Sequence, residues 1–282
     1  MTRREGQLDL VTQRDHAALA GTLAEHWGNA SFAVPSPRDA LLCAAIHHDD
    51  GWAELDDGPA FDAEAGRPAH FTEVPLEESA GPYGRGVESV YERDRHAGVL
   101  VSMHWSGFST GRWGVGPGRP SQNPVALEIV GRQEARWMPV LREVWANRGR
   151  RSEFDVANWH AYEVLQAVDV LSLGLALIDL EHPGDGEVVG VSQVLSQVDQ
   201  TPGPRAVTGV PLAAGGATVT LVLRTHDPGR VTLDPYPFDV DELEVGFPIR
   251  RLPDERYASE GAAAAALRRA PTDQRRATLV AV

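Results

Sequence analysis

The segment Ala45–Trp52 holds the densest group of side chains that could do chemistry. Within it His48 is followed directly by Asp49, so a neutral nitrogen ligand and an anionic oxygen ligand lie at one point of the chain. Zinc, iron and manganese ions favour that combination. The preceding apolar run, Leu41–Ile46, predicts a buried helix that carries the pair into the core, and Gly51 is suited to end that helix. The doublet therefore indicates a site for a divalent metal ion.

Residues of the same types recur on the other helices that the sequence predicts. They are His16 and His26 on the first, His104 at the end of the third and Asp169 on the last. Metal sites in helical bundles are built from side chains that point inward from facing helices. Asp169 lies between two valines, where a buried carboxylate needs a partner to offset its desolvation. A metal ion would serve, and a helix terminus or an arginine is the alternative.

The order of these residues carries a resemblance. His16, then His48-Asp49, then Asp169 resembles the ligand order of the HD-domain superfamily of metal-dependent phosphohydrolases, and His16–Ala24 looks like the segment of its first ligand. Further segments are similar, more narrowly, to an uncharacterised bacterial family related to HD proteins, over most of the chain up to about Pro253. These segments are Asp15–Gly28, His48–Trp52, Ser102–His104, Leu165–Leu173 and Pro235–Phe238. The resemblance implies an HD-like helical bundle and a metal held by His16, His48, Asp49 and Asp169.

Three more residues are candidates for catalysis. Asp50 is either a general base beside a metal-bound water or a solvated carboxylate. His26 lies only about 80° around the helix from His16, so it either donates a proton at the pocket mouth or packs structurally against Trp27. His104 lies where a helix meets a loop, a common place for substrate contact.

The resemblance leaves the reaction open. We expect hydrolysis of a phosphoester by a metal-activated water, with zinc, manganese or iron as the cofactor. The superfamily also includes di-iron oxygenases such as myo-inositol oxygenase, which take two extra histidine ligands. Here His104 would be one and His70 a weaker second. A third hypothesis is a non-catalytic ligand-binding or interaction module, with Tyr236 and Phe238 on its docking surface.

Composition limits the classes of partner. The chain has 282 residues, 42% hydrophobic and 23% charged, and a net charge of -14, which argues against nucleic-acid binding. The single Cys43 excludes an internal disulfide framework. No apolar run reaches the roughly 18 residues of a membrane helix, so we expect a cytoplasmic protein without a membrane partner. The expected ligand is a small molecule, phosphorylated under the hydrolase hypothesis.

The periodicity predicts a mostly α fold with a small antiparallel β appendage near the C-terminus. Helices are expected at His16–Trp27, Ala40–Asp49, Val87–Met103, Val125–Ala146 (kinked or broken at Pro139) and Ala157–Leu180. Strands are expected at Leu8–Thr12, Val188–Val194, Ala217–Arg224, Arg230–Leu233 and Leu243–Ile249. Gly51–Gly86 has no sustained period and is expected to be a loop or lid. We therefore divide the chain into a helical domain (1–183), a β appendage (184–253) and a loosely attached, partly disordered tail (254–282).

Overall fold

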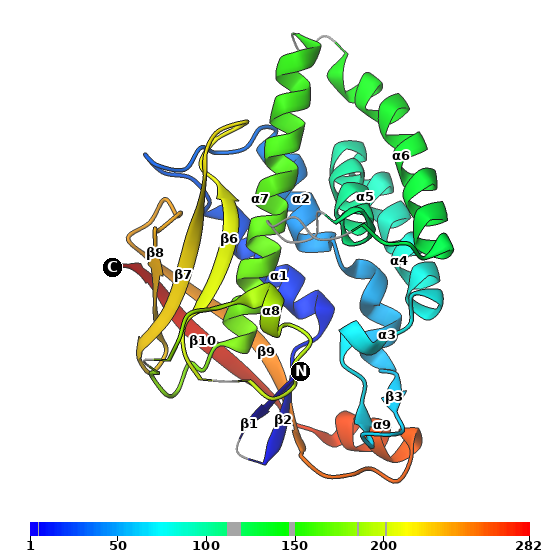
Figure 1. Cartoon of the computed structure of the whole chain (residues 1–282), viewed down its shortest axis with the longest axis vertical. Coiled ribbons are helices and arrows are strands. Elements are labelled where there is room, and N and C mark those ends of the chain that lie inside the picture. The colour runs from blue at the N-terminus through cyan, green and yellow to red at the C-terminus, as the bar shows by residue number, and fades with distance from the viewer. Residues whose placement is uncertain (5, 112–119, 147–149, 185, 201) are drawn as a thin grey trace.

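The computed structural model describes residues 1–4, 6–111, 120–146, 150–184, 186–200 and 202–282. Its longest helix, α7 (Arg151–Leu177), lies between the sheet and most of the other helices (Figure 1). The second half of α7 is mostly apolar on all sides, so both of its faces can be covered. Leu165, Leu171 and Leu175 of this half are fully buried. Helix α7 is therefore the centre of the core.

The other helices of this half of the molecule pack around α7 or around one another. They are α1 (Gln13–Glu25), α2 (Arg38–His47), α3 (Ala53–Asp57), α4 (Leu76–Arg93), α5 (Arg95–Thr110) and α6 (Pro124–Trp145). The single helix predicted at Val87–Met103 is instead divided between α4 and α5. The break falls at Asp94, whose carboxylate accepts a hydrogen bond from Ala97 N and caps α5. Helix α6 is one helix that contains Pro139 rather than ending there.

An eight-stranded mixed sheet forms the other half of the molecule. Its strand order is β1-β2-β9-β10-β8-β7-β6-β5. The strands are β1 (Thr2–Arg4), β2 (Gln7–Leu10), β5 (Val189–Gly190), β6 (Arg205–Pro211), β7 (Thr218–Asp227), β8 (Arg230–Asp234), β9 (Glu242–Pro253) and β10 (Thr272–Ala281). β10 is antiparallel to β9 and parallel to β8. Buried and exposed residues alternate along β9, as expected for a strand with one face on the core.

The predicted fold class, a helical bundle with a small antiparallel β appendage, is wrong. The sheet is mixed, and it takes strands from the first ten residues as well as from the last ten or so. It therefore crosses both of the predicted boundaries, at 183 and at 253. The predicted loose tail is also wrong, because residues 260–269 form α9 (Glu260–Arg269) and β10 lies between two other strands. Pairing between distant segments gives these strands their place, and no local period reveals it.

Two smaller expectations also differ from the structure. The strand predicted at Val188–Val194 is the two-residue β5 followed by the short helix α8 (Val191–Val194). The predicted loop Gly51–Gly86 holds several short elements and the start of α4. These elements are η1 (Asp50–Trp52), α3, the hairpin of β3 (Phe61–Asp62) and β4 (Arg67–Pro68), and η2 (Phe71–Glu73).

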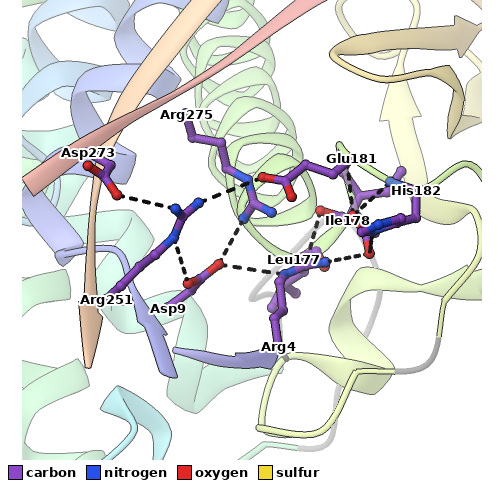
Figure 2. Close-up of polar contacts among 10 residues, drawn as sticks. Arg4, Asp9, Leu177, Ile178, Glu181, His182, Arg251, Asp273 and Arg275 are labelled. Atoms are coloured by element: carbon purple, nitrogen blue, oxygen red, sulfur yellow. Dashed lines mark hydrogen bonds and ion pairs between the residues drawn. The ribbon is translucent and has the colours of Figure 1, made fainter. Parts of the chain in front are cut away.

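A network of arginines and carboxylates joins the N-terminal hairpin to α7, β9 and β10 (Figure 2). Arg4 donates hydrogen bonds to the carbonyl oxygens of the last residues of α7 and its cap, at 2.8 and 2.9 Å. The buried Asp9 carboxylate lies 3.8 Å from Arg4 Nε, 3.4 Å from Arg251 Nε and 3.8 Å from Arg275 Nη1. We call the group of Arg4, Asp9, Arg251 and Arg275 the arginine network. It ties together strands that are far apart in the sequence.

Candidate metal centre

Five buried side chains from different helices converge in the helical half. They form two overlapping groups, His16/His48/Asp49 and His48/His104/Asp169, within each of which the ligand atoms lie no more than 4.8 Å from one another. None of the five is more than 5% exposed. We call these five residues the histidine cluster. The cluster brings together α1, the end of α2, α5 and α7.

The end of α2 explains how two adjacent residues face one point. Side chains of neighbouring helical residues diverge by about 100°. Helix α2 ends at His47, His48 is its C-cap, and Asp49 has already left the helical conformation. His48 Nδ1 donates to Ala45 O in the last turn, at 2.9 Å, which satisfies a terminal carbonyl and fixes the ring.

His16 is held from outside the cluster in the same way. The Ser172 hydroxyl donates to Asp169 O at 2.7 Å, so its oxygen accepts from His16 Nδ1 at 2.9 Å. The lone pair of His16 Nε2 then faces Asp49 Oδ2 at 2.9 Å. A lone pair and a carboxylate oxygen this close require a proton or a metal cation between them.

His104 completes this pattern. Its Nδ1 lies 2.6 Å from the Gln166 amide nitrogen, and its Nε2 lies 4.0 Å from Asp169 Oδ2. Gln166 Oε1 is buried without a hydrogen-bond partner. A half-turn of the amide would let this oxygen accept from Nδ1–H, leaving the Nε2 lone pair toward the carboxylates. Gln166 can therefore hold His104 in the tautomer that binds a metal.

His48 Nε2 is the atom left without a partner at the centre. It is buried and has no hydrogen bond, and it lies 3.4 Å from Asp169 Oδ1 and 3.7 Å from Asp49 Oδ2. Each of the three imidazoles is therefore tied at Nδ1, and its Nε2 lies within 4.0 Å of Asp49, Asp169 or both. Hydrogen bonds of this kind orient metal-binding histidines in proteins.

Among the described residues, only the imidazoles of the histidine cluster balance the charge of its carboxylates. Burial alone would lower the pKa of His48, but the nearby Asp49 and Asp169 carboxylates raise that pKa to about 9. Burial would likewise raise the pKa of Asp49, yet His48 and the other cluster histidines lower it to about 2. Burial lowers the pKa of His104 to about 4. Across the described residues no arginine forms an ion pair with Asp49 or Asp169. Without a bound cation, a proton on an imidazole must fill that role.

Tyr83 of α4 adds a neutral hydroxyl to the histidine cluster. Its OH is buried without a regular hydrogen-bond partner, and burial together with Asp49 and Asp169 raises its pKa well above 10. Two glycines allow α4 to approach this closely. A Cβ on Gly86 would lie 2.4 Å from Gly51 N, and one on Gly51 would lie 2.6 Å from Tyr83 Cα. Larger residues at either position would push Tyr83 away.

The structure places three predicted candidates outside the histidine cluster. His26 is the C-cap of α1, about 15 Å along the helix axis from His16. Its Nδ1 lies 3.0 Å from Asp239 Oδ1. Asp50 lies in η1, 3.0 Å from the ring of His47. His70 caps η2 and accepts a hydrogen bond from Thr72 N. Neither metal-type group of the described residues includes any of these three.

The sequence reasoning missed Ser172, Gln166 and Tyr83. The first two could have been found, because residues three apart on a helix share a face and both lie three residues from Asp169. A run of polar residues at that spacing in an apolar helix indicates a polar face. Tyr83 gave no such signal, since its place depends on the contact between α4 and η1.

Comparison with known proteins identifies the family. Residues 1–254 match the model of a family described as protein of unknown function (DUF3891), so the chain belongs to that family. The match ends before α9 and β10. No curated protein and no solved structure matches the chain. Within the described residues, every helix is too short or too polar to cross a bilayer.

Proposed function

We propose that this member of the DUF3891 family is a metal-dependent phosphohydrolase that holds one divalent cation in the histidine cluster. His16, His48, Asp49 and Asp169 would be its ligands, and His104 a further ligand or a substrate contact. One observation carries the proposal: each imidazole is tied at Nδ1, and its Nε2 lies within 4.0 Å of Asp49, Asp169 or both, two carboxylates that no described arginine neutralises. The resemblance to HD-domain hydrolases supports the same ligand set.

The donor set fits zinc, manganese or iron(II), because imidazole nitrogen and carboxylate oxygen suit these ions. When bound, such an ion polarises a phosphoryl oxygen and lowers the pKa of a coordinated water. In hydrolysis the water oxygen bonds to phosphorus and the bond from phosphorus to the alcohol oxygen breaks, while one proton passes to the alcohol. Tyr83 stays protonated at neutral pH, so it can donate a hydrogen bond to a phosphoryl or leaving oxygen.

The proposal takes one ion rather than two. His48 donates a hydrogen bond from Nδ1 to Ala45 O, so only its Nε2 is left to bind a metal. Both three-residue groups need that nitrogen. The di-iron hypothesis also needs an extra histidine, and His70 lies outside the cluster.

Turnover and metal content together test the proposal. Protein loaded with zinc, manganese or iron(II) should hydrolyse phosphomonoesters or phosphodiesters. His48→Ala and Asp169→Ala should lose the metal and at least about a hundredfold of turnover. His26→Ala, which removes an imidazole outside the cluster, is the matched control and should retain both. Full metal and full turnover in the two cluster variants would refute the assignment. Two irons per chain with oxygen-dependent substrate loss would support the oxygenase instead.

A further inference from the structure

The hydroxyl of Tyr83 lies beside the histidine cluster without a hydrogen bond that fixes its direction. Tyr83 belongs to α4, whereas the five cluster residues come from α1, α5, α7 and the end of α2. Burial together with the nearby Asp49 and Asp169 carboxylates raises its pKa well above 10. The hydroxyl oxygen is buried and has no hydrogen-bond partner of regular geometry within the described residues. Its direction must therefore come from the packing of the phenol ring.

Three aromatic rings pack around the phenol ring of Tyr83. The indole of Trp105 is stacked on it, with ring centroids 5.1 Å apart and an angle of 19° between the planes. Trp52 and Phe108 meet it edge-on, with centroids at 6.5 and 6.1 Å and interplanar angles of 87° and 82°. Stacked and edge-on pairs are the arrangements that aromatic rings favour. These contacts restrict how far the phenol ring can turn.

Trp105 is the ring of the three that is tied most directly to the histidine cluster. It follows His104 in α5, so one stretch of backbone carries both a cluster imidazole and the indole that stacks on Tyr83. Its side chain is buried, with 7% exposure, whereas Phe108 is 41% exposed. The backbone of α4 also lies against the indole, because a Cβ on Gly84 would lie 3.6 Å from Trp105 Cη2. Trp105 therefore fixes the phenol ring relative to α5 and its imidazole.

We propose that Trp105 is a positioning residue, which holds the Tyr83 hydroxyl in the direction of a phosphoryl oxygen bound at the metal. The inference rests on the proposed function and adds a residue that acts on the phosphate only through Tyr83. A hydrogen bond weakens steeply as its angle departs from linearity. Without the stacked indole the phenol ring can turn, so the contact to the phosphoryl oxygen weakens although every polar group of the site is still present.

Binding of inorganic phosphate to the metal-loaded full-length protein, measured by calorimetry, tests this role without requiring turnover. Tyr83→Phe removes the hydroxyl and should raise the Kd about tenfold. Trp105→Leu keeps the hydroxyl but removes the stacked ring, and it should raise the Kd about fivefold. The double variant should bind phosphate no more weakly than Tyr83→Phe alone, because Trp105 acts only through the hydroxyl. Trp105→Phe keeps a ring that can stack and should remain within about twofold of wild type.

Metal content and a second tryptophan provide the controls. Trp105→Leu should retain the metal content of wild type, since it removes no ligand. Trp137→Leu is the matched control, because Trp137 of α6 also contacts α5, through a hydrogen bond to Ser102 Oγ at 2.7 Å. It should leave both the metal content and the Kd for phosphate unchanged. If Trp105→Leu does not fold, Trp105→Met fills more of the same space and gives the same comparison.

The kcat values of the same variants separate this inference from the proposed function. If phosphoesters are hydrolysed but the losses from Tyr83→Phe and Trp105→Leu multiply in the double variant, the positioning role is wrong and the hydrolase proposal stands. If nothing is hydrolysed but phosphate binding shows the coupled pattern, the positioning role stands and the reaction is wrong. Loss of metal from Trp105→Leu would also overturn the inference. Wild-type protein that neither binds phosphate nor hydrolyses a phosphoester would refute both.

Discussion

The arginine network around Asp9 and the histidine cluster around Asp49 and Asp169 both bury carboxylates, but they contain different cations. Asp9 is surrounded by three guanidinium groups, which stay charged at neutral pH. Burial and the neighbouring Arg4 lower the pKa of Arg275 only to about 10. Asp49 and Asp169 face imidazoles, which carry charge only when protonated. The first group keeps its cation permanently, whereas the second can exchange a proton for a metal ion.

That difference assigns separate tasks to the two groups. The arginine network joins β1, β2, β9, β10 and the end of α7, and a fixed charge suits a joint (Figure 2). The histidine cluster instead gathers three imidazoles and two carboxylates within ligand distance of one another, an arrangement that suits a metal ion. We therefore expect changes in the network to alter stability alone and changes in the cluster to alter metal binding.

The largest effect on stability should come from Asp9→Asn. The substitution leaves three guanidinium groups without their shared counter-charge. Removing one partner of a buried ion pair lowers the free energy of unfolding by about 3–5 kcal/mol. Urea unfolding measures the loss. Asp273→Asn, which removes the more exposed partner of Arg251, is the control and should cost less than about 1 kcal/mol. Loss of metal binding in folded Asp9→Asn would break the distinction between the two groups.

Removal of the metal should have the next largest effect on stability. A ligand that binds only the folded state stabilises it by about 2.7 kcal/mol at a hundred times its Kd. Chelator should therefore lower the unfolding midpoint of loaded wild-type protein. It should leave the unfolding midpoint of Asp49→Asn unchanged, since that variant has no metal to lose. Equal chelator sensitivity in the two proteins would show that any metal binds elsewhere.

Tyr83→Phe should affect turnover without affecting metal content. Loss of one hydrogen bond worth about 1.4 kcal/mol in the transition state lowers kcat about tenfold. Steady-state kinetics and elemental analysis of the same preparation separate the two readouts. Unchanged kcat would exclude Tyr83 from the reaction, and loss of metal would make its role structural.

The smallest expected effect on stability comes from Asp56, a carboxylate that pairs with neither an arginine nor a histidine within the described residues. Asp56 has hydrogen bonds only from the backbone of Gln13 and Arg14 within the described residues, and burial raises its pKa to about 6. With a pKa above the unfolded value, Asp56 stabilises the fold fully only below about pH 4. That contribution is lost as the pH rises through about 6.

Asp56→Asn should therefore be more stable than wild type at pH 8, by about 1 kcal/mol after allowing for partial solvent access, and should lose this advantage at pH 4.5. Urea unfolding at the two pH values measures the difference. If the variant were less stable than wild type at pH 8, the hydrogen bonds that the Asp56 carboxylate accepts from Gln13 N and Arg14 N would outweigh the cost of burying its charge.

Residue types and the resemblance to HD proteins together indicated the histidine cluster, whereas local sequence did not show how the strands form one sheet. His48-Asp49 and Asp169 stand out because polar residues in apolar helical segments need partners, and both lie in the cluster. His26, Asp50 and His70 looked equally suitable as types, but their positions depend on where α1, η1 and η2 end. The difference lies in tertiary geometry, which residue type does not encode.

Strands were expected close to β2, β7, β8 and β9, but β1, β6 and β10 were missed, and so was the joining of all these strands into one sheet, because that joining depends on distant partners. β10 carries two arginines and two threonines, and it was taken for a tail. Its buried Arg275, Ala277 and Leu279 are separated by the more exposed Arg276 and Thr278, a period of two that becomes meaningful only beside β8 and β9. Strand β1 likewise gains its place through the arginine network rather than from apolar side chains of its own.

Elemental analysis of protein purified without chelators, then incubated with zinc, manganese or iron(II) and desalted, tests the central claim most directly. Wild type and Asp9→Asn should each hold about one ion per chain, while Asp49→Asn and Asp169→Asn should hold almost none. Wild-type protein that retains no ion, or equal metal content in all four proteins, would contradict the claim that the histidine cluster is a metal centre.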